Sequence, residues 1–209
     1  AQPLIDRALA VLRARLDAED STLLDAIEEK AWLAQEQGRL DEAAPLYSEV
    51  LASRRAANGE AHRTTLRAIW NMGHVRQAQG NADEAEAFFR EVLAKRHGVL
   101  ADRDPLVLDV QSALGLLLRG RGRLAEAEQL LREAIAGRAA SEGEASEDAL
   151  ESYDHLALLL ADQGKLAEAE ALHRRTLAGR RQALGEEHPA TLISNDNLAT
   201  VLQALGRAA

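Results

Sequence analysis

Large apolar residues recur along this 209-residue chain at spacings that fit helices. Leucine stands fourteen residues before each of five glycines, and a pair made of a large apolar residue and then alanine or glycine stands eight and seven residues before four of them. Further apolar residues stand eight and thirteen residues after the glycines. These spacings follow the 3.6-residue period and predict two helices per repeat, here named helix A before the glycine and helix B after it.

The glycines set the period of the repeat. They are Gly38, Gly80, Gly122, Gly164 and Gly206, each 42 residues after the one before. A fixed period of this length indicates a stacked array of helix pairs, in which the glycine ends helix A. In the links between pairs, His62 and His188 precede helix A, and Pro105 and Pro189 occupy its first position, so we expect the histidines to cap helices rather than bind metal.

This register predicts one all-α array over residues 1–209. It begins with a helix B at 1–17, continues with helix pairs at 20–57, 62–99, 104–140 and 146–184, and ends with a lone helix A at 188–205. An unpaired terminal helix leaves an apolar face that could dock another copy end to end. The alternative is that the terminal helices act as caps.

An arginine recurs near the end of helix B in each of the four helix pairs. The four are Arg54, Arg96, Arg138 and Arg180. A cation there complements the carbonyl end of the helix dipole, and the alternative is a basic patch that binds anions. Because the arginine is present in every copy, we favour the first interpretation.

Composition and charge limit the classes of function. Acidic residues outnumber basic ones by 34 to 25, for a net charge of −9, which argues against a nucleic-acid partner. The chain has no cysteine, which fits a reducing, cytoplasmic compartment. No apolar run approaches the ~18 residues of a membrane span, so no membrane contact is expected. The histidines lack metal-ligand spacing and no nucleophile motif is present, so we expect no metal, no cofactor and no enzyme activity.

Two copies carry the residues of a known repeat. They are Ile69, Met72, Gly73, Ala85 and Phe89 in one copy, and Tyr153, Leu156, Ala157 and Ala169 in another. This pattern resembles the tetratricopeptide repeat (TPR), and the 42-residue step with the LGEEHP turn at 184–189 resembles the arrays of kinesin light chain. A period near 42 also suits HEAT and armadillo repeats, but the small residue and the glycine in every copy favour the tetratricopeptide family.

The resemblance implies a fold and a binding surface. It implies an α-solenoid, a right-handed superhelix of antiparallel helix pairs, with helices A lining a concave groove. The A-helix positions not used in packing vary, and the first copy has Asp25, Glu28, Glu29 and Trp32 there. We expect peptide-binding residues at Arg67, Trp70, Asn71, His74, Gln77, Arg119, Asp154, His155, Asp196 and Asn197.

The roles of these residues come from the resemblance and from their chemistry. Asparagines at two of the positions bind peptide backbone in the family, so the resemblance gives that role to Asn71 and Asn197, whereas Glu29, Ala113 and His155 depart from the pattern. Trp70 would supply a flat anchor; packing of Trp70 and Trp32 between helices is the alternative. The groove has more acidic than basic residues, which favours a neutral or basic segment.

Three functions fit these features. The first is a non-catalytic scaffold that binds a peptide or protein segment in the groove. The second is a self-association module whose terminal helices stack end to end into homo-oligomers. The third is a regulatory arm of a larger enzyme.

Overall fold

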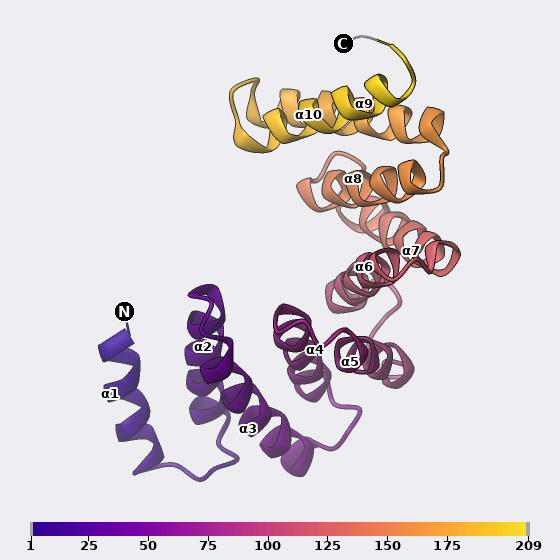
Figure 1. Cartoon of the computed structure of the whole chain (residues 1–209). Helices are drawn as coiled ribbons and strands as arrows, with labels where there is room; N and C mark the ends of the chain where they lie inside the picture. The colour runs from indigo at the N-terminus through magenta and orange to yellow at the C-terminus, as the bar shows by residue number, and fades with distance from the viewer. Residues whose placement is uncertain (1, 208–209) are drawn as a thin grey trace. The chain divides into compact units, whose positions relative to one another are not determined.

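The computed structural model describes residues 2–207, with side chains from residue 4 onward. This part of the chain contains ten α-helices and no strand, which confirms the all-α fold class. The chain divides into two compact units, Ala1–Ala101 and Asp102–Ala209. In both units each helix packs against the helices next to it in sequence, the arrangement of an α-solenoid (Figure 1).

The first unit contains five helices. They are α1 (Gln2–Arg13), α2 (Ser21–Glu36), α3 (Leu40–Asn58), α4 (Arg63–Ala78) and α5 (Ala82–Lys95). Helices α2 and α4 are helices A, and α1, α3 and α5 are helices B. The main packing contacts join α1 to α2, α2 to α3, α3 to α4 and α4 to α5.

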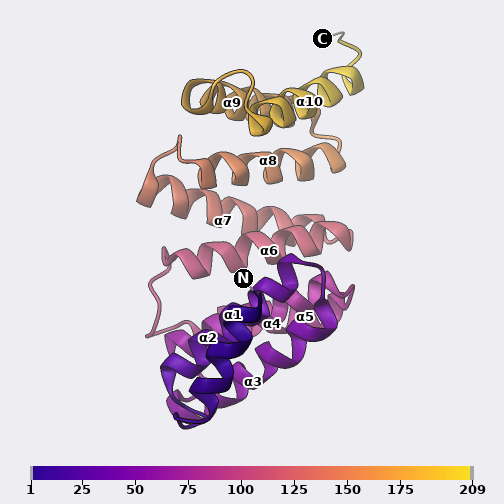
Figure 2. The same cartoon turned by 90° about the vertical axis from the view of Figure 1, so that its left-hand side faces the viewer.

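The second unit contains the remaining five helices. They are α6 (Pro105–Gly120), α7 (Leu124–Glu142), α8 (Glu147–Asp162), α9 (Leu166–Leu184) and α10 (Pro189–Ala204). Helices α6, α8 and α10 are helices A, and α7 and α9 are helices B. Figure 2 shows α6, α7 and α8 following one another in layers in the order of the sequence, with α9 and α10 together beyond α8.

The helix ends follow from side chains that satisfy free backbone groups. Each helix A begins at a residue whose side chain accepts a hydrogen bond from the N–H two or three residues further on. These residues are Asp20, His62, Asp104, Ser146 and His188. The capping role predicted for His62 and His188 is therefore confirmed, and it accounts for both histidines without a metal.

Helix α5 is shorter than its counterparts. It has 14 residues, whereas α3, α7 and α9 each have 19 and are followed by a glycine with positive φ. The matching position after α5 is Ala101, and Gly98, with φ 78°, comes earlier instead. A left-handed residue ends a helix, so α5 stops before the residue 99 expected from the register.

Helices A and B of one pair pack closely because a small residue faces a large one. A Cβ added at Gly73 of α4 would overlap the ring of Phe89 on α5, and one added at Gly115 of α6 would overlap Leu131 on α7. All four residues are buried. Glycine is thus required in α4 and α6 by packing rather than by backbone conformation.

Candidate protein-interaction surface

Three of the recurring arginines are buried and connect neighbouring helices. Arg54, Arg138 and Arg180 each donate to a polar side chain 26 residues earlier on helix A of the same pair. The acceptors are Glu28 Oε2 at 2.8 Å, Ser112 Oγ at 3.1 Å and Asp154 Oδ2 at 2.6 Å. We name these contacts the arginine network.

The arginine network also reaches the next pair in the second unit. Arg138 donates to Ser152 and Arg180 donates to Ser194 at 2.7 Å, in both cases 14 residues later. Because Arg54, Arg138 and Arg180 are buried and paired, they do not form a basic patch on the surface. They also do more than complement a helix dipole, since each one bridges separate helices.

The arginine network places one predicted ligand-binding residue in the core. Asp154 is only 5% exposed. Its Oδ1 lies 3.0 Å from Nδ1 of His173, and its Oδ2 accepts the bond from Arg180. The prediction that Asp154 faces a peptide is therefore corrected, because both oxygens already have buried partners.

The other predicted residues of the second unit lie on three helices A. Arg119 of α6 pairs with Asp162 of α8 at 2.5 Å. His155 of α8 is half-buried, and burial lowers the pKa of its imidazole. On α10, Asp196 is exposed and Asn197 is half-buried. None of these residues lines either of the two pockets described below.

The five predicted residues of the first unit all lie on α4, and two of them form an aromatic cluster. The ring centroid of Trp70 is 3.8 Å from that of His74 in an edge-on contact and 5.4 Å from that of Phe89 on α5. Trp70 is half-buried by this packing. Trp70 is therefore better described as a side chain that packs between helices than as a free anchor for a peptide.

Burial also affects the charge of His74. Desolvation lowers the pKa of its imidazole from 6.5 to about 4. Above pH 6.5 the side chain is neutral in the folded and unfolded states. Between pH 6.5 and about 4 only the unfolded chain binds the proton, so the free energy of unfolding falls as the pH falls.

We therefore expect the first unit to lose stability on acidification through His74. The loss should amount to at most about 1.4 kcal/mol per pH unit over that window. Urea unfolding at pH 7 and pH 5 would measure it, with His74→Leu as the comparison. An equal loss in His74→Leu would contradict the assignment to this residue.

An open pocket lies between α2 and α4, and we name it the Trp32 pocket. Its volume is about 370 Å³. It is lined by Asp25, Glu28, Glu29 and Trp32 of α2, Tyr47 of α3, and Arg67 and Asn71 of α4. Trp32 is 49% exposed, so it is the accessible aromatic side chain here, in contrast to Trp70.

Most of the charge in the Trp32 pocket is already paired. Glu28 accepts hydrogen bonds from Arg54 and, at 2.7 Å, from Asn71 Nδ2. It also forms an ion pair with Arg67 Nε at 3.3 Å. Asp25 accepts from Arg54 at 2.7 Å. Glu29 has no ion pair or hydrogen bond from its side chain within residues 2–207. Within the Trp32 pocket, the acidic surface predicted from the sequence is therefore reduced to the unpaired carboxylate of Glu29.

Tyr47 is the lining residue that sequence analysis missed. Its position matches Phe89, Leu131 and His173 in the other pairs, all of which are buried. The repeat pattern thus predicts that residue 47 lies in the core. Only the residue type, tyrosine, indicates that a polar hydroxyl group is present there.

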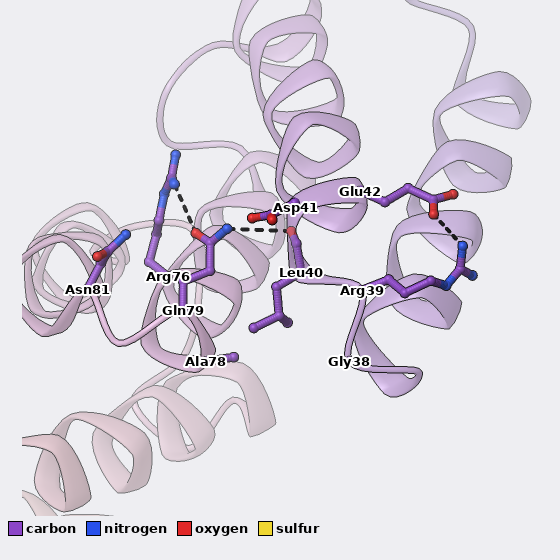
Figure 3. A pocket seen from close by; sticks show the side chains of 9 residues that line it. All are labelled: Gly38, Arg39, Leu40, Asp41, Glu42, Arg76, Ala78, Gln79 and Asn81. Carbon is purple, nitrogen blue, oxygen red and sulfur yellow. Dashed lines mark hydrogen bonds and ion pairs between the residues drawn. The ribbon is translucent and has the colours of Figure 1, made fainter.

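A larger pocket lies at the turns of the first unit (Figure 3). It has a volume of about 800 Å³ and is lined by residues 38–42, Arg76, Ala78, Gln79 and Asn81. The side chain of Gln79 accepts a hydrogen bond from Arg76 at 3.0 Å and donates one to the Leu40 carbonyl at 3.5 Å. Gln163 makes the matching bond to the Leu124 carbonyl in the second unit. Because the contact recurs, we interpret this pocket as the crevice between successive turns.

Two family models, each described as Tetratricopeptide repeat, match residues 64–140 and residues 23–64 and 149–190. Together the matched segments cover more than half of the chain. The chain belongs to the tetratricopeptide repeat family. No curated protein matches its sequence.

Solved structures of other tetratricopeptide proteins are similar to this one. BtubC (BKLC) from P. vanneervenii is 21% identical with a TM-score of 0.81, over 97% of this chain and 80% of that chain. A Podosopora anserina kinesin light chain with nearly identical TPR-like repeats is 28% identical with a TM-score of 0.77, over 88% and 87%. A variant of that protein is 26% identical with a TM-score of 0.79, over 92% and 90%. This tetratricopeptide protein is of the kinesin light chain-like type.

Family membership supports a general role for this tetratricopeptide protein. Tetratricopeptide arrays and kinesin light chain-like proteins are typically non-catalytic scaffolds for protein partners, and the repeats of this chain support a role as a protein-interaction scaffold. In the part of the chain that the structure describes, no helix is long and apolar enough to cross a membrane. The same part holds no group of three or more side chains able to bind a metal ion.

Proposed function

We propose that this tetratricopeptide protein is a non-catalytic scaffold that binds an extended, neutral or basic segment of a partner protein on the A-helix surface of its first unit. The observation that carries the proposal is the Trp32 pocket, where an exposed tryptophan stands beside polar side chains from α2 and α4. Exposed aromatic side chains beside pockets are typical centres of protein interfaces.

The polar groups on α4 suit the backbone of an extended segment. An extended peptide presents N–H and C=O groups that need partners. Asn71 donates through Nδ2 to Glu28, which fixes its amide and leaves Oδ1 to accept from a peptide N–H. Gln77, two turns further along α4, offers a second amide. These contacts require no particular sequence in the ligand.

Charge selects among segments. Glu29 on α2 is an unpaired carboxylate on this surface, and Arg67 is anchored to Glu28. An acidic segment would place like charges against Glu29, whereas a basic one would gain an attraction that added salt screens. On the second unit, Arg119, His155, Asp196 and Asn197 remain proposed contacts, and Asp154 does not.

Replacing Trp32 with alanine should weaken binding about thirtyfold or more without a large loss of stability. An exposed aromatic anchor contributes about 2 kcal/mol or more at an interface but little to the fold. Fluorescence polarisation with basic and acidic peptide libraries at two ionic strengths would measure the affinity. Leu184→Ala at the end of α9, a helix B position that is 39% exposed, is the matched control. A preference for acidic peptides, or equal affinity of the Trp32→Ala variant, would contradict the proposal.

Self-association is a second candidate function. Leu4 and Val11 on α1 are exposed, as are Leu192 and Ile193 on α10. Exposed apolar side chains on a helix face favour contact with another protein surface, including a second copy. Light scattering across a range of protein concentrations separates the two candidates, because a monomer at high concentration contradicts self-association and leaves peptide binding unaffected.

A further inference from the structure

We infer that the Trp32 pocket receives a cationic side chain, that of lysine or arginine, from the bound segment. The inference rests on the proposed function for the source of the side chain. It adds a specificity site, formed by Glu29 and Trp32 of α2 with Tyr47 of α3, to the surface described above.

The first observation is a buried tyrosine whose hydroxyl group lacks a partner. Tyr47 lines the pocket from α3 and is only 3% exposed. Among the residues that the structure describes, its hydroxyl has no hydrogen-bond partner. The hydroxyl keeps contact with solvent through the open pocket, so a ligand that fills the pocket displaces that solvent and has to supply a hydrogen bond in its place. A tyrosine hydroxyl can accept a hydrogen bond from an ammonium or guanidinium group.

The second observation is the unpaired carboxylate of Glu29. The neighbouring carboxylates share Arg54 and Arg67, which leaves Glu29 as the group whose charge is not compensated by the described part of the chain. Burial raises the pKa of the Tyr47 hydroxyl, and the charges of Glu28, Glu36 and Glu29 raise it further, so the hydroxyl stays protonated at neutral pH. An anionic ligand group would be repelled by Glu29, and an apolar one would leave both Glu29 and Tyr47 without a partner.

The third observation is the position of Trp32. Residues 29 and 32 are three apart on α2 and are therefore neighbours on its surface. A cation held by the Glu29 carboxylate would lie beside the exposed indole, where cation–π attraction applies. The methylene groups of lysine or arginine could cover the indole ring while the charged end reaches Glu29.

The inference can be tested without knowing the partner. The chain has two tryptophans, so a ¹⁵N-labelled sample gives two indole N–H signals, which a Trp32→Phe spectrum assigns. We would titrate the whole chain with Nα-acetyl-lysine methylamide, with its arginine analogue, and with the neutral norleucine analogue. The lysine and arginine compounds should shift the Trp32 signal in a saturable manner, and norleucine should bind at least about threefold more weakly.

Variants identify the groups responsible. Glu29→Gln and Tyr47→Phe should each weaken binding of the lysine compound about threefold or more. Glu187→Gln makes the same charge change in an exposed loop of the second unit and should leave the affinity unchanged. Glu29 is exposed, so its variant keeps the test decisive even if Tyr47→Phe is unstable.

Two outcomes would overturn the inference. One is equal affinity for the lysine and norleucine compounds, and the other is unchanged affinity in Glu29→Gln. If peptides still bind in a Trp32-dependent manner while the small cations do not, the inference fails and the proposed function stands. If basic peptides fail to bind but the small cations shift Trp32, the pocket is a cation site and the proposed function fails.

Discussion

Asp154→Asn should lower the free energy of unfolding of the second unit by about 3 kcal/mol. The carboxylate of Asp154 is buried between His173 Nδ1 and Arg180 Nη1. An amide of the same size keeps the packing but leaves the charge of Arg180 with less compensation in the core. Removing one partner of a buried ion pair typically costs about 3–5 kcal/mol for this reason. Urea unfolding monitored by circular dichroism would measure the change.

The matched control is Asp162→Asn on the same helix. Asp162 also pairs with an arginine, Arg119, but its side chain is exposed. Exposed ion pairs contribute about 0–1 kcal/mol, so the control should unfold almost like the native chain. Similar losses in both variants would mean that the Asp154 contacts do not stabilise the core as the structure indicates. A large loss of peptide binding in a stable Asp154→Asn variant would restore Asp154 to the binding surface.

Gly73→Ala should destabilise the first unit by about 1–3 kcal/mol. The added Cβ would lie 2.7 Å from Cδ1 of Phe89 and closer still to Cε1. Phe89 is fully buried against Trp70 and His74, so its ring has little room to move. Adding a methyl group to a filled core typically has a cost of this size. Thermal unfolding would measure it.

A second glycine provides the control for helix propensity. Gly120 is the last residue of α6, and a Cβ there would meet no atom within 4 Å. Gly120→Ala should therefore stabilise the chain slightly, by about 0.4–1 kcal/mol, because alanine reduces the freedom of the unfolded state. Phe89→Leu combined with Gly73→Ala should recover part of the loss. If the double variant is no more stable than Gly73→Ala, the ring of Phe89 is not the cause.

The positions of the helices could be predicted from the sequence because they depend on local chemistry. The glycine period, the caps such as His62 and the apolar spacing each act within one or two turns of a helix. Helices α3 and α7 end at Asn58 and Glu142, one and two residues past the expected ends of their pairs. The larger departure, the early end of α5, follows from Gly98 taking the place of a glycine at position 101, and this departure is visible in the sequence.

Whether an individual side chain assigned to the groove is exposed or buried could not be predicted in the same way. Asp154 lies ten residues before its glycine, a position assigned to the groove, but Arg180 reaches it from 26 residues away. Trp70 has the same position in its own repeat and packs on Phe89, whereas Trp32 lies six residues before its glycine and remains exposed. Such outcomes depend on which long side chain arrives from another helix, and repeat spacing does not specify that.

The arginine network has a consequence for engineering proteins from these repeats. Arg138 and Arg180 each bind a residue 26 positions earlier and a serine 14 positions later, so their partners fall in two successive repeats. A graft cut from one glycine to the next would keep the arginine with its later serine but separate it from its earlier acceptor, and would leave a buried guanidinium facing whatever the host supplies. The transferable segment therefore extends from the early acceptor through the later serine and crosses the boundary between two repeats.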